Sequence, residues 1–324
     1  MTEQITLVIH GVESAAEIPG IARIKDHAHI HCAPDLDSLQ RHLPGAEVLL
    51  GWNFRATELR EAWPLVDRLR WVQWGGAGVD AVLFPELVAS DVLLTNARGV
   101  FDRAMAEYTL GLILAFAKEL PETCAAQREH RWSYRWTELA EGRSVLVVGV
   151  GSIGREIARM LDRVGFVVSG VGRSARDTDP DFGQVHGVAD LNRCLGEADY
   201  VVLVTPLTPQ TQGLFGAPQF SAMKPSARFI NLGRGELVDE TALLEALEDN
   251  SIAGAGLDVF CTEPLPAESP FWDLDNVIVS PHMSGDFQGH KEAMVEVFLD
   301  NFERFRNGRE LVNLIDKSLG FARI

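Results

Sequence analysis

Three polar side chains of complementary chemistry each stand just after a segment that is predicted to be a β-strand. They are Arg234 in Asn231-Leu-Gly-Arg-Gly-Glu236, Glu263 in Leu257-Asp-Val-Phe-Cys-Thr-Glu-Pro-Leu-Pro266, and His282 in Ser280-Pro-His-Met-Ser-Gly285. Open α/β sheets bind ligands at the carboxyl ends of their strands. We therefore expect the arginine, the glutamate and the histidine to lie in one crevice.

An arginine, a glutamate and a histidine in one crevice could reduce a 2-oxo acid. The fork of Arg234 fits two oxygens and would bind the carboxylate and the carbonyl of the substrate. His282 suits the proton donor for the alkoxide that forms on hydride attack, and a neighbouring Glu263 would favour its protonated form and fix its tautomer. General acid catalysis of this kind contributes about 10²–10⁴-fold in rate. The hydride chemistry itself would belong to a nicotinamide.

Each of these side chains also has a structural interpretation. Arg234 could be a surface ion-pair partner, Glu263 a loop carboxylate before Pro264, and His282 a structural residue after Pro281. Taken singly, the structural interpretation is favoured for Glu263 and equals the catalytic one for His282. Their joint placement after strands, downstream of a glycine-rich turn, favours a catalytic set.

That glycine-rich turn lies within Ser144–Gly154 and would position a cofactor. A Val-rich run, typical of a buried parallel strand, breaks at Gly149, and a segment with helical spacing of apolar residues starts at Arg155. Gly149 permits the tight turn, Gly151 lets a pyrophosphate approach the backbone, and Gly154 lets the helix pack on the strand. The phosphates would bind the N–H groups at the start of the helix. The flanking strand and helix favour a dinucleotide site over a plain turn.

The end of the next strand indicates which nicotinamide cofactor binds. An NAD site carries an acidic residue about 20 positions after the first glycine, where it binds the ribose diol. Gly172 stands there instead, and Arg173, Ser174 and Arg176 follow it. The missing acid removes repulsion toward a 2′-phosphate, and Arg173 offers that phosphate a bidentate partner, unless it is only a solvated loop residue. We therefore expect NADP, with NAD also possible.

Strands and helices alternate along the whole chain, which predicts an α/β protein. The expected strands are Ile5–His10, Ala46–Trp52, Leu69–Trp74, Val92–Asn96, Val145–Gly149, Phe166–Val171, Tyr200–Thr205, Arg228–Leu232, Gly254–Val259 and Val277–Ser280. The expected helices include Thr57–Trp63, Asp102–Leu120 (stopped by Pro121), Glu240–Glu248 (capped by Asp239) and Gly289–Arg306.

Two long helical segments bracket the cofactor-binding part and suggest a partner domain that is built from both ends of the chain. We expect two doubly wound domains. A Rossmann cofactor domain (99–286) would be inserted in a discontinuous, flavodoxin-like substrate domain (1–98 and 287–324).

Composition excludes several classes of function. The 324 residues suffice for two domains, and a net charge of −17 argues against nucleic acid and anionic membranes as partners. No apolar run reaches the roughly 18 residues of a membrane helix. The chain enters a strand at once without a signal-peptide pattern, and its four cysteines lack paired spacing. We expect a cytoplasmic protein with reduced thiols.

The segment His27-Ala-His-Ile-His-Cys32 would place three imidazoles on one face of a strand, which suggests a metal site. No carboxylate lies nearby in the sequence. We favour the exposed face of an edge strand and expect no metal.

Together the motifs resemble the D-isomer-specific 2-hydroxyacid dehydrogenase family. The resemblance is close from about Ala140 to Gly285 and rests on the glycine turn and the three segments above. It rests also on Val204-Thr-Pro-Leu-Thr-Pro-Gln-Thr211, Met223-Lys-Pro225 and Gly254-Ala-Gly-Leu-Asp-Val-Phe260. The first hundred residues match more loosely, through Gly75-Gly-Ala-Gly-Val-Asp80, which resembles the substrate loop of the family.

The resemblance implies roles for individual residues. Arg234, Glu263 and His282 would be the catalytic set, and the substrate would contact Gly76, Ala77, Gly78, Arg234 and His282. The cofactor would contact Gly149, Gly151, Ser152, Ile153, Gly154, Gly172, Arg173, Ser174, Thr205, Pro206, Thr211, Leu232, Gly233, Arg234, Asp258, His282, Ser284 and Gly285. A homodimer is also implied, with Asp102–Leu120 and the segment around Trp132 at its interface.

The expected activity is the NADPH-linked reduction of a short 2-oxo acid to the D-2-hydroxy acid. The strand end at Gly172 and Arg173 and the Glu263–His282 pair resemble those of the glyoxylate/hydroxypyruvate reductase branch. Formate dehydrogenases of this fold instead pair their histidine with glutamine. A formate- or phosphite-type dehydrogenase and a non-catalytic NAD(P)-sensing protein remain alternatives. Arg98 could bind a second anionic group of the substrate or face solvent, and we favour solvent. The side-chain pocket would draw on Trp52, Phe54, Trp74, Arg98 and Trp132.

Overall fold

The computed structural model describes residues 4–322, and this stretch forms two units. The first unit runs to Phe101 and resumes at Phe287, and the second spans Asp102–Asp286. Each unit is built on a mainly parallel sheet with helices packed against it. The α/β class predicted from the alternating pattern is confirmed.

The sheet of the first unit is entirely parallel, in the order β2-β1-β3-β4-β5, which is the flavodoxin-like order. Its strands are β1 (Ile5–His10), β2 (Ala28–Ala33), β3 (Val48–Gly51), β4 (Trp71–Trp74) and β5 (Leu93–Thr95). The histidine-rich segment forms β2 at the edge of this sheet, with His29 exposed, as predicted. Among the described residues, no group of three or more metal-ligating side chains could hold a metal ion.

Helices cover both faces of this sheet, and the sheet separates two hydrophobic clusters. The helices are α1 (Leu36–His42), α2 (Glu58–Ala62), α3 (Pro85–Ala89) and α10 (His290–Arg306), with short 3-10 turns η1 (Ala15–Glu17), η2 (Ile21–Ile24), η3 (Trp63–Leu65) and η4 (Asp80–Val82). On one face Trp71 stacks on Phe298 of α10, with ring centroids 5.4 Å apart. Trp74 is fully buried on the other face, so the expectation that it lines a substrate pocket is wrong. The chain then ends in the hairpin of β14 (Ile315–Asp316) and β15 (Phe321–Ala322).

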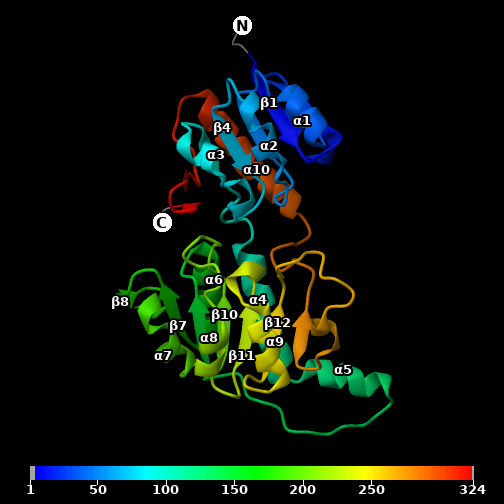
Figure 1. The fold of residues 1–324 in the computed structure, drawn as a ribbon, viewed down its shortest axis with the longest axis vertical. Coiled ribbons are helices and arrows are strands. Elements are labelled where there is room, and N and C mark those ends of the chain that lie inside the picture. Colours follow the sequence, from blue (N-terminus) through cyan, green and yellow to red (C-terminus); the bar gives the residue numbers. More distant parts are fainter. Residues whose placement is uncertain (1–3, 323–324) are drawn as a thin grey trace. The chain divides into compact units, whose positions relative to one another are not determined.

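The second unit has an eight-stranded sheet in the order β13-β12-β11-β10-β6-β7-β9-β8 (Figure 1). Its strands are β6 (Ser144–Val148), β7 (Val167–Gly172), β8 (Arg176–Asp179), β9 (Gly183–Gly187), β10 (Tyr200–Leu203), β11 (Arg228–Asn231), β12 (Gly254–Leu257) and β13 (Val277–Val279). All neighbours are parallel except β8 and β9. The order reverses between β6 and β10, which is the switch point of a Rossmann sheet.

Two features of the second unit differ from the sequence prediction. The hairpin β8–β9 was not expected, because its exposed strand Arg176–Asp179 is polar and lacks an apolar alternation. The predicted helix Asp102–Leu120 ends at Ala117, and Pro121 lies in the first turn of a new helix rather than after the old one. Proline is tolerated there because the first N–H groups of a helix need no intrahelical partner.

The helices of this unit pack on both faces of the sheet, except α5. They are α4 (Asp102–Ala117), α5 (Leu120–Arg128), α6 (Ser152–Arg163), α7 (Leu191–Leu195), α8 (Ala217–Ala222) and α9 (Glu240–Glu248), with η5 (Val188–Asp190), η6 (Gly235–Leu237) and η7 (Pro270–Asp273). The bounds of α9 and its cap are confirmed, since Asp239 accepts hydrogen bonds from the N–H groups of Thr241 and Ala242.

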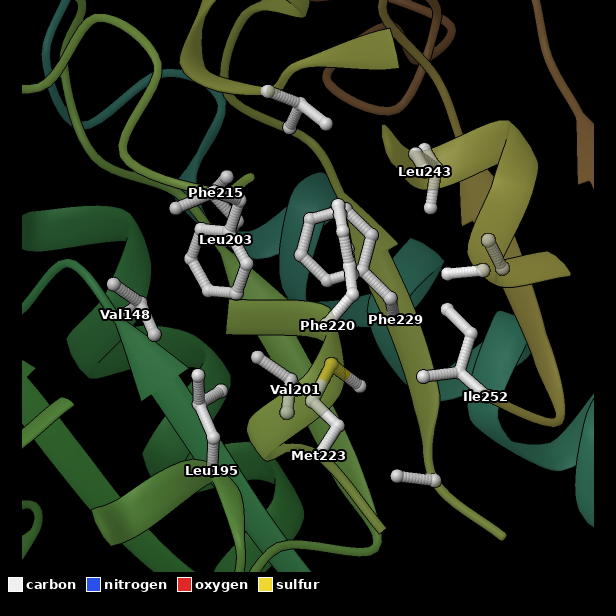
Figure 2. Close-up of a cluster of buried hydrophobic side chains, with 14 of the residues drawn as sticks. Val148, Leu195, Val201, Leu203, Phe215, Phe220, Met223, Phe229, Leu243 and Ile252 are labelled. Carbon is white, nitrogen blue, oxygen red and sulfur yellow. The ribbon is translucent and has the colours of Figure 1, made fainter. Parts of the chain in front are cut away.

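A cluster of aromatic and aliphatic side chains fixes β6, β10 and β11 against α8 and α9 (Figure 2). Phe229 lies at its centre, 4.9 Å from Phe215 and 5.4 Å from Phe220 between ring centroids. Because this core is rigidly packed, the carboxyl ends of its strands give the loops above them a defined position. No helix among residues 4–322 is long and apolar enough to cross a membrane.

Helix α5 and the segment that follows it stand away from the sheet of the second unit (Figure 1). This arm, residues 120–140, exposes aromatic side chains. Trp132, Tyr134 and Trp136 are 97%, 77% and 87% exposed.

Candidate active site

The glycine-rich turn connects β6 to α6, and each glycine meets a different constraint. A Cβ on Gly149, where φ is 117°, would lie 2.7 Å from the carbonyl carbon of Val204, and one on Gly154 would lie 1.9 Å from the oxygen of Gly149. Gly151 instead has open space where a Cβ would point. The first bond of α6 runs from Arg155 N–H to Gly151 O, so the preceding N–H groups of the helix have no intrahelical partner. The turn therefore leaves room and donors for a diphosphate.

Thr205 stands beside this turn, just after β10 on the other side of the switch point. Its Oγ1 is buried and has no hydrogen-bond partner among the described residues. A buried hydroxyl without a partner is costly, and a bound polar ligand would satisfy it. The open space at Gly151 and the hydroxyl of Thr205 fit a nicotinamide dinucleotide.

The end of β7 shows why the position of the usual acidic residue holds a glycine. A Cβ on Gly172 would lie 2.7 Å from Cγ2 of Val150, so a side chain here would displace that valine. Arg173 and Ser174 follow and are exposed. A residue with a side chain at position 172 would therefore require the side chain of Val150 to move.

Ion pairs hold the hairpin β8–β9 against α6 at this end of the sheet. Arg155 donates to both oxygens of Asp179 at 2.9 Å, and Nε of Arg176 lies 3.2 Å from Asp179 Oδ2. These hydrogen bonds, first that of Arg155, lower the pKa of Asp179 to about 2. Sequence reasoning missed this cluster, because Arg155 and Asp179 lie 24 positions apart and only the fold makes them neighbours.

Glu263 and His282 form a hydrogen-bonded pair. His282 Nδ1 lies 2.8 Å from Glu263 Oε2, and Phe260 N–H donates to Glu263 Oε1 at 3.1 Å. The side chain of His282 is only 19% exposed and that of Glu263 only 22%. With Nδ1–H donating to the carboxylate, Nε2 is the ring nitrogen that can exchange a proton with a ligand.

Asp258, which follows β12 and is fully buried, holds the loop that carries His282. Its carboxylate accepts hydrogen bonds from Ser280 Oγ at 2.6 Å and from the N–H groups of Met283 and Ser284 at 2.9 Å each. His282 itself has φ of 54°, in the left-handed region that is unfavourable for a residue with a side chain. Three hydrogen bonds to one buried carboxylate offset this strain and fix the histidine.

The segment of Arg234 follows β11 and packs on the segment of Glu263. Asn231 Nδ2 donates to Arg234 O at 2.9 Å, and Gly233 N–H donates to Asn231 Oδ1 at 3.1 Å. A Cβ on Gly235 would lie 2.0 Å from the carbonyl carbon of Phe260. Because β11, β12 and β13 are adjacent, the structure brings the arginine, glutamate and histidine segments to one edge of the sheet. Sequence reasoning did not assign the turn-forming amide of Asn231, although Asn-x-Gly after a strand is typical of such turns.

The predicted substrate loop belongs to the first unit and follows β4. Two of its glycines are required by close approach, because a Cβ on Gly75 would lie 2.7 Å from Trp52 O and one on Gly76 would lie 2.9 Å from Cβ of Phe54. Asn96 Nδ2 donates to Ala77 O at 2.6 Å. The loop is thus held from both sides within its own unit.

Comparison with known proteins gives a consistent picture. Residues 110–284 match the family model described as D-isomer specific 2-hydroxyacid dehydrogenase, NAD binding domain. The chain is 32% identical to a glyoxylate reductase of Korarchaeum cryptofilum over 267 residues, 80% of each chain. It is also 32% identical to a glyoxylate/hydroxypyruvate reductase B of Citrobacter koseri over 308 residues, 91% of this chain and 93% of the relative.

Solved structures are similar to this protein over nearly the whole length of its chain. An NADPH-dependent glyoxylate/hydroxypyruvate reductase of Sinorhizobium meliloti, in complex with NADP and sulfate, superposes with a TM-score of 0.83 at 30% identity, covering 98% of this chain and all of the other. A D-isomer specific 2-hydroxyacid dehydrogenase of Xanthobacter autotrophicus, in complex with NADPH and MES, gives 0.81 at 31% identity and covers 97% and 100%.

Proposed function

Because the chain belongs to the D-isomer specific 2-hydroxyacid dehydrogenase family, we propose that it reduces a short 2-oxo acid of the glyoxylate/hydroxypyruvate type with NADPH. The product is the D-2-hydroxy acid. The observation that supports this most is the Glu263–His282 pair, 2.8 Å apart at the same sheet edge as Arg234 and the glycine turn.

The nicotinamide, when bound, would supply the hydride for the carbonyl carbon of the substrate. His282 gives the proton from Nε2 to the carbonyl oxygen, and Glu263 stabilises the imidazolium before transfer. Arg234 binds the carboxylate and polarises the carbonyl. The N–H groups of the loop Gly76–Gly78 bind the carboxylate. His282 is left neutral and regains its proton from solvent.

NADP(H) would be held along the carboxyl edge of the second sheet. The turn Gly149–Gly154 takes the diphosphate, and Thr205 offers its hydroxyl to the cofactor. Arg173 and Ser174 bind the 2′-phosphate, with Arg176 beside them. Asp258 and Ser284, which the sequence also assigns to the cofactor, belong to the hydrogen-bond network that holds the His282 loop.

We also propose a homodimer that forms through α4 and the arm 120–140. Trp132 and Trp136 are 97% and 87% exposed, and large exposed apolar side chains gathered in one segment mark interaction surfaces. The dimer would bury them. A cytoplasmic location is in keeping with four free cysteines.

The test follows NADPH oxidation, at the nicotinamide absorbance, on adding glyoxylate or hydroxypyruvate. We expect turnover with both acids, faster with NADPH than with NADH, and D-glycerate as the product from hydroxypyruvate. Tight NADPH binding without turnover of any 2-oxo acid would favour the nucleotide-sensing alternative. Reduction of NADP⁺ by formate or phosphite would favour the dehydrogenase alternative.

A further inference from the structure

The substrate loop of the first unit is oriented by one buried amide. Asn96, only 5% exposed, donates from Nδ2 to Ala77 O at 2.6 Å, while Ala97 N–H donates to Gly76 O at 3.0 Å. The carbonyl groups of residues 76 and 77 therefore both face the Asn96 segment. In a trans peptide the N–H points opposite to the carbonyl of the same plane. The N–H groups of Ala77 and Gly78 are thereby turned away from this segment, and both residues are partly exposed.

The C-terminal tail, which is the segment after α10, holds the Asn96 segment in turn. Asn313 Nδ2 donates to Arg98 O at 2.9 Å and to Asn96 O at 3.4 Å, and an antiparallel bridge joins Thr95 to Leu314. Asn313 has φ of 59°, a left-handed conformation that asparagine tolerates better than most residues. The tail therefore contacts the strand end that carries Asn96, on the opposite side from the loop.

A second amide, Asn301 of α10, anchors the tail. It is fully buried, donates to Val312 O at 3.1 Å and to Gln73 Oε1 at 3.2 Å, and accepts from Val312 N–H at 2.8 Å. Gln73 Oε1 also accepts from Thr95 Oγ1 at 2.8 Å. A satisfied buried network of this kind fixes one geometry, whereas apolar side chains would pack without fixing peptide orientation.

We propose that Asn96 and Asn313 are positioning residues for the carboxylate-binding loop Gly76–Gly78, so that the C-terminal tail sets the affinity for the 2-oxo acid. This rests on the proposed function. Both residues belong to the first unit, whereas the cofactor turn and the Glu263–His282 pair belong to the second. Their loss therefore weakens substrate binding and leaves the affinity for NADPH unchanged.

The experiment compares Asn96→Asp and Asn313→Gly with the wild-type enzyme. Asn96→Asp keeps the shape but places a carboxylate against Ala77 O, so the peptide reorients, and KM for glyoxylate rises about tenfold or more. Asn313→Gly keeps the left-handed backbone without the two donors, and KM rises about fivefold. We expect kcat within about twofold and the NADPH dissociation constant unchanged.

Lys317→Met is the matched control on the same tail. Lys317 Nζ donates to the carbonyl oxygens of Leu87, Ser90 and Val92 and does not contact the Asn96 segment. The Lys317→Met substitution should lower the melting temperature of the enzyme without changing KM for glyoxylate. Unchanged KM in Asn313→Gly, or an equal rise in Lys317→Met, overturns the proposal.

Oxamate binding to the enzyme–NADPH complex, followed by nicotinamide fluorescence, separates this inference from the proposed function. A wild-type enzyme that neither turns over 2-oxo acids nor binds oxamate overturns the function. A wild-type enzyme that does both, with variants that retain its KM and its oxamate affinity, overturns only the role of the tail.

Discussion

Replacing Glu263 with glutamine changes one atom of the pair that carries the proposed proton transfer. In the native site one carboxylate accepts two hydrogen bonds, from His282 Nδ1–H and from Phe260 N–H. An amide has a single acceptor oxygen. If that oxygen faces His282, the NH₂ group opposes Phe260 N–H. If it faces Phe260, the NH₂ group favours the tautomer of His282 that lacks hydrogen on Nδ1.

Both arrangements of the amide disfavour the imidazolium that donates the proton. A hydrogen bond to a charged group contributes about 1.5–3 kcal/mol, and the pair is sheltered enough for this range to apply, with side chains 19% and 22% exposed. Since each 1.36 kcal/mol is a factor of ten, Glu263→Gln should lower kcat by about 10- to 100-fold. KM should change little, because Arg234 remains in place.

The assay is steady-state NADPH oxidation by glyoxylate across the neutral pH range, with the NADPH dissociation constant measured in parallel. Glu268→Gln, at an exposed carboxylate of the same loop, is the control and should behave as wild type. His282→Ala should lower kcat by about 10²–10⁴-fold without changing NADPH binding. A kcat of Glu263→Gln within twofold of wild type would refute the role of the pair.

Three further outcomes follow from the second unit. Arg173→Ala should raise KM for NADPH about tenfold or more and leave KM for NADH unchanged, and equal losses for both cofactors would contradict the 2′-phosphate assignment. Asp179 has a pKa of about 2 in the folded state, against the ordinary value of 3.8 that applies to the unfolded chain. The carboxylate therefore adds about 2 kcal/mol to the free energy of unfolding above about pH 4, and this contribution is lost as the pH falls toward 2. Urea unfolding should therefore show Asp179→Asn less stable than wild type at pH 6, with the difference narrowing at pH 3; a constant difference would contradict this. Trp132→Ser combined with Trp136→Ser should give monomers by light scattering, and an unchanged mass would remove the arm from the interface.

The predictions that succeeded from sequence rest on local patterns. The Val-rich run before Gly149 and the segment before Arg234 are buried strands, and the segment before His282 is a partly buried strand. Such strands carry their signal in consecutive apolar residues. The carboxyl-edge argument then follows from topology alone. The hairpin β8–β9 escaped prediction, because its strand is polar and is held by ion pairs to α6. Pro121 misled the helix boundary, because a proline that ends one helix and a proline that starts the next look alike in sequence.

The amides that hold the substrate loop and the tail were missed for a related reason. Asn96, Asn301 and Asn313 have no spacing that marks them, and they acquire partners only in the folded chain. Gly172 shows a different limit. From sequence, its importance is the absence of a negative charge near a 2′-phosphate. In the structure it also makes room for Val150, since a Cβ there would lie 2.7 Å from the valine. Charge and packing therefore both bear on this one position. Restoring an acid at residue 172 would require the side chain of Val150 to move, so a test of cofactor preference should pair the acid with a smaller residue at position 150.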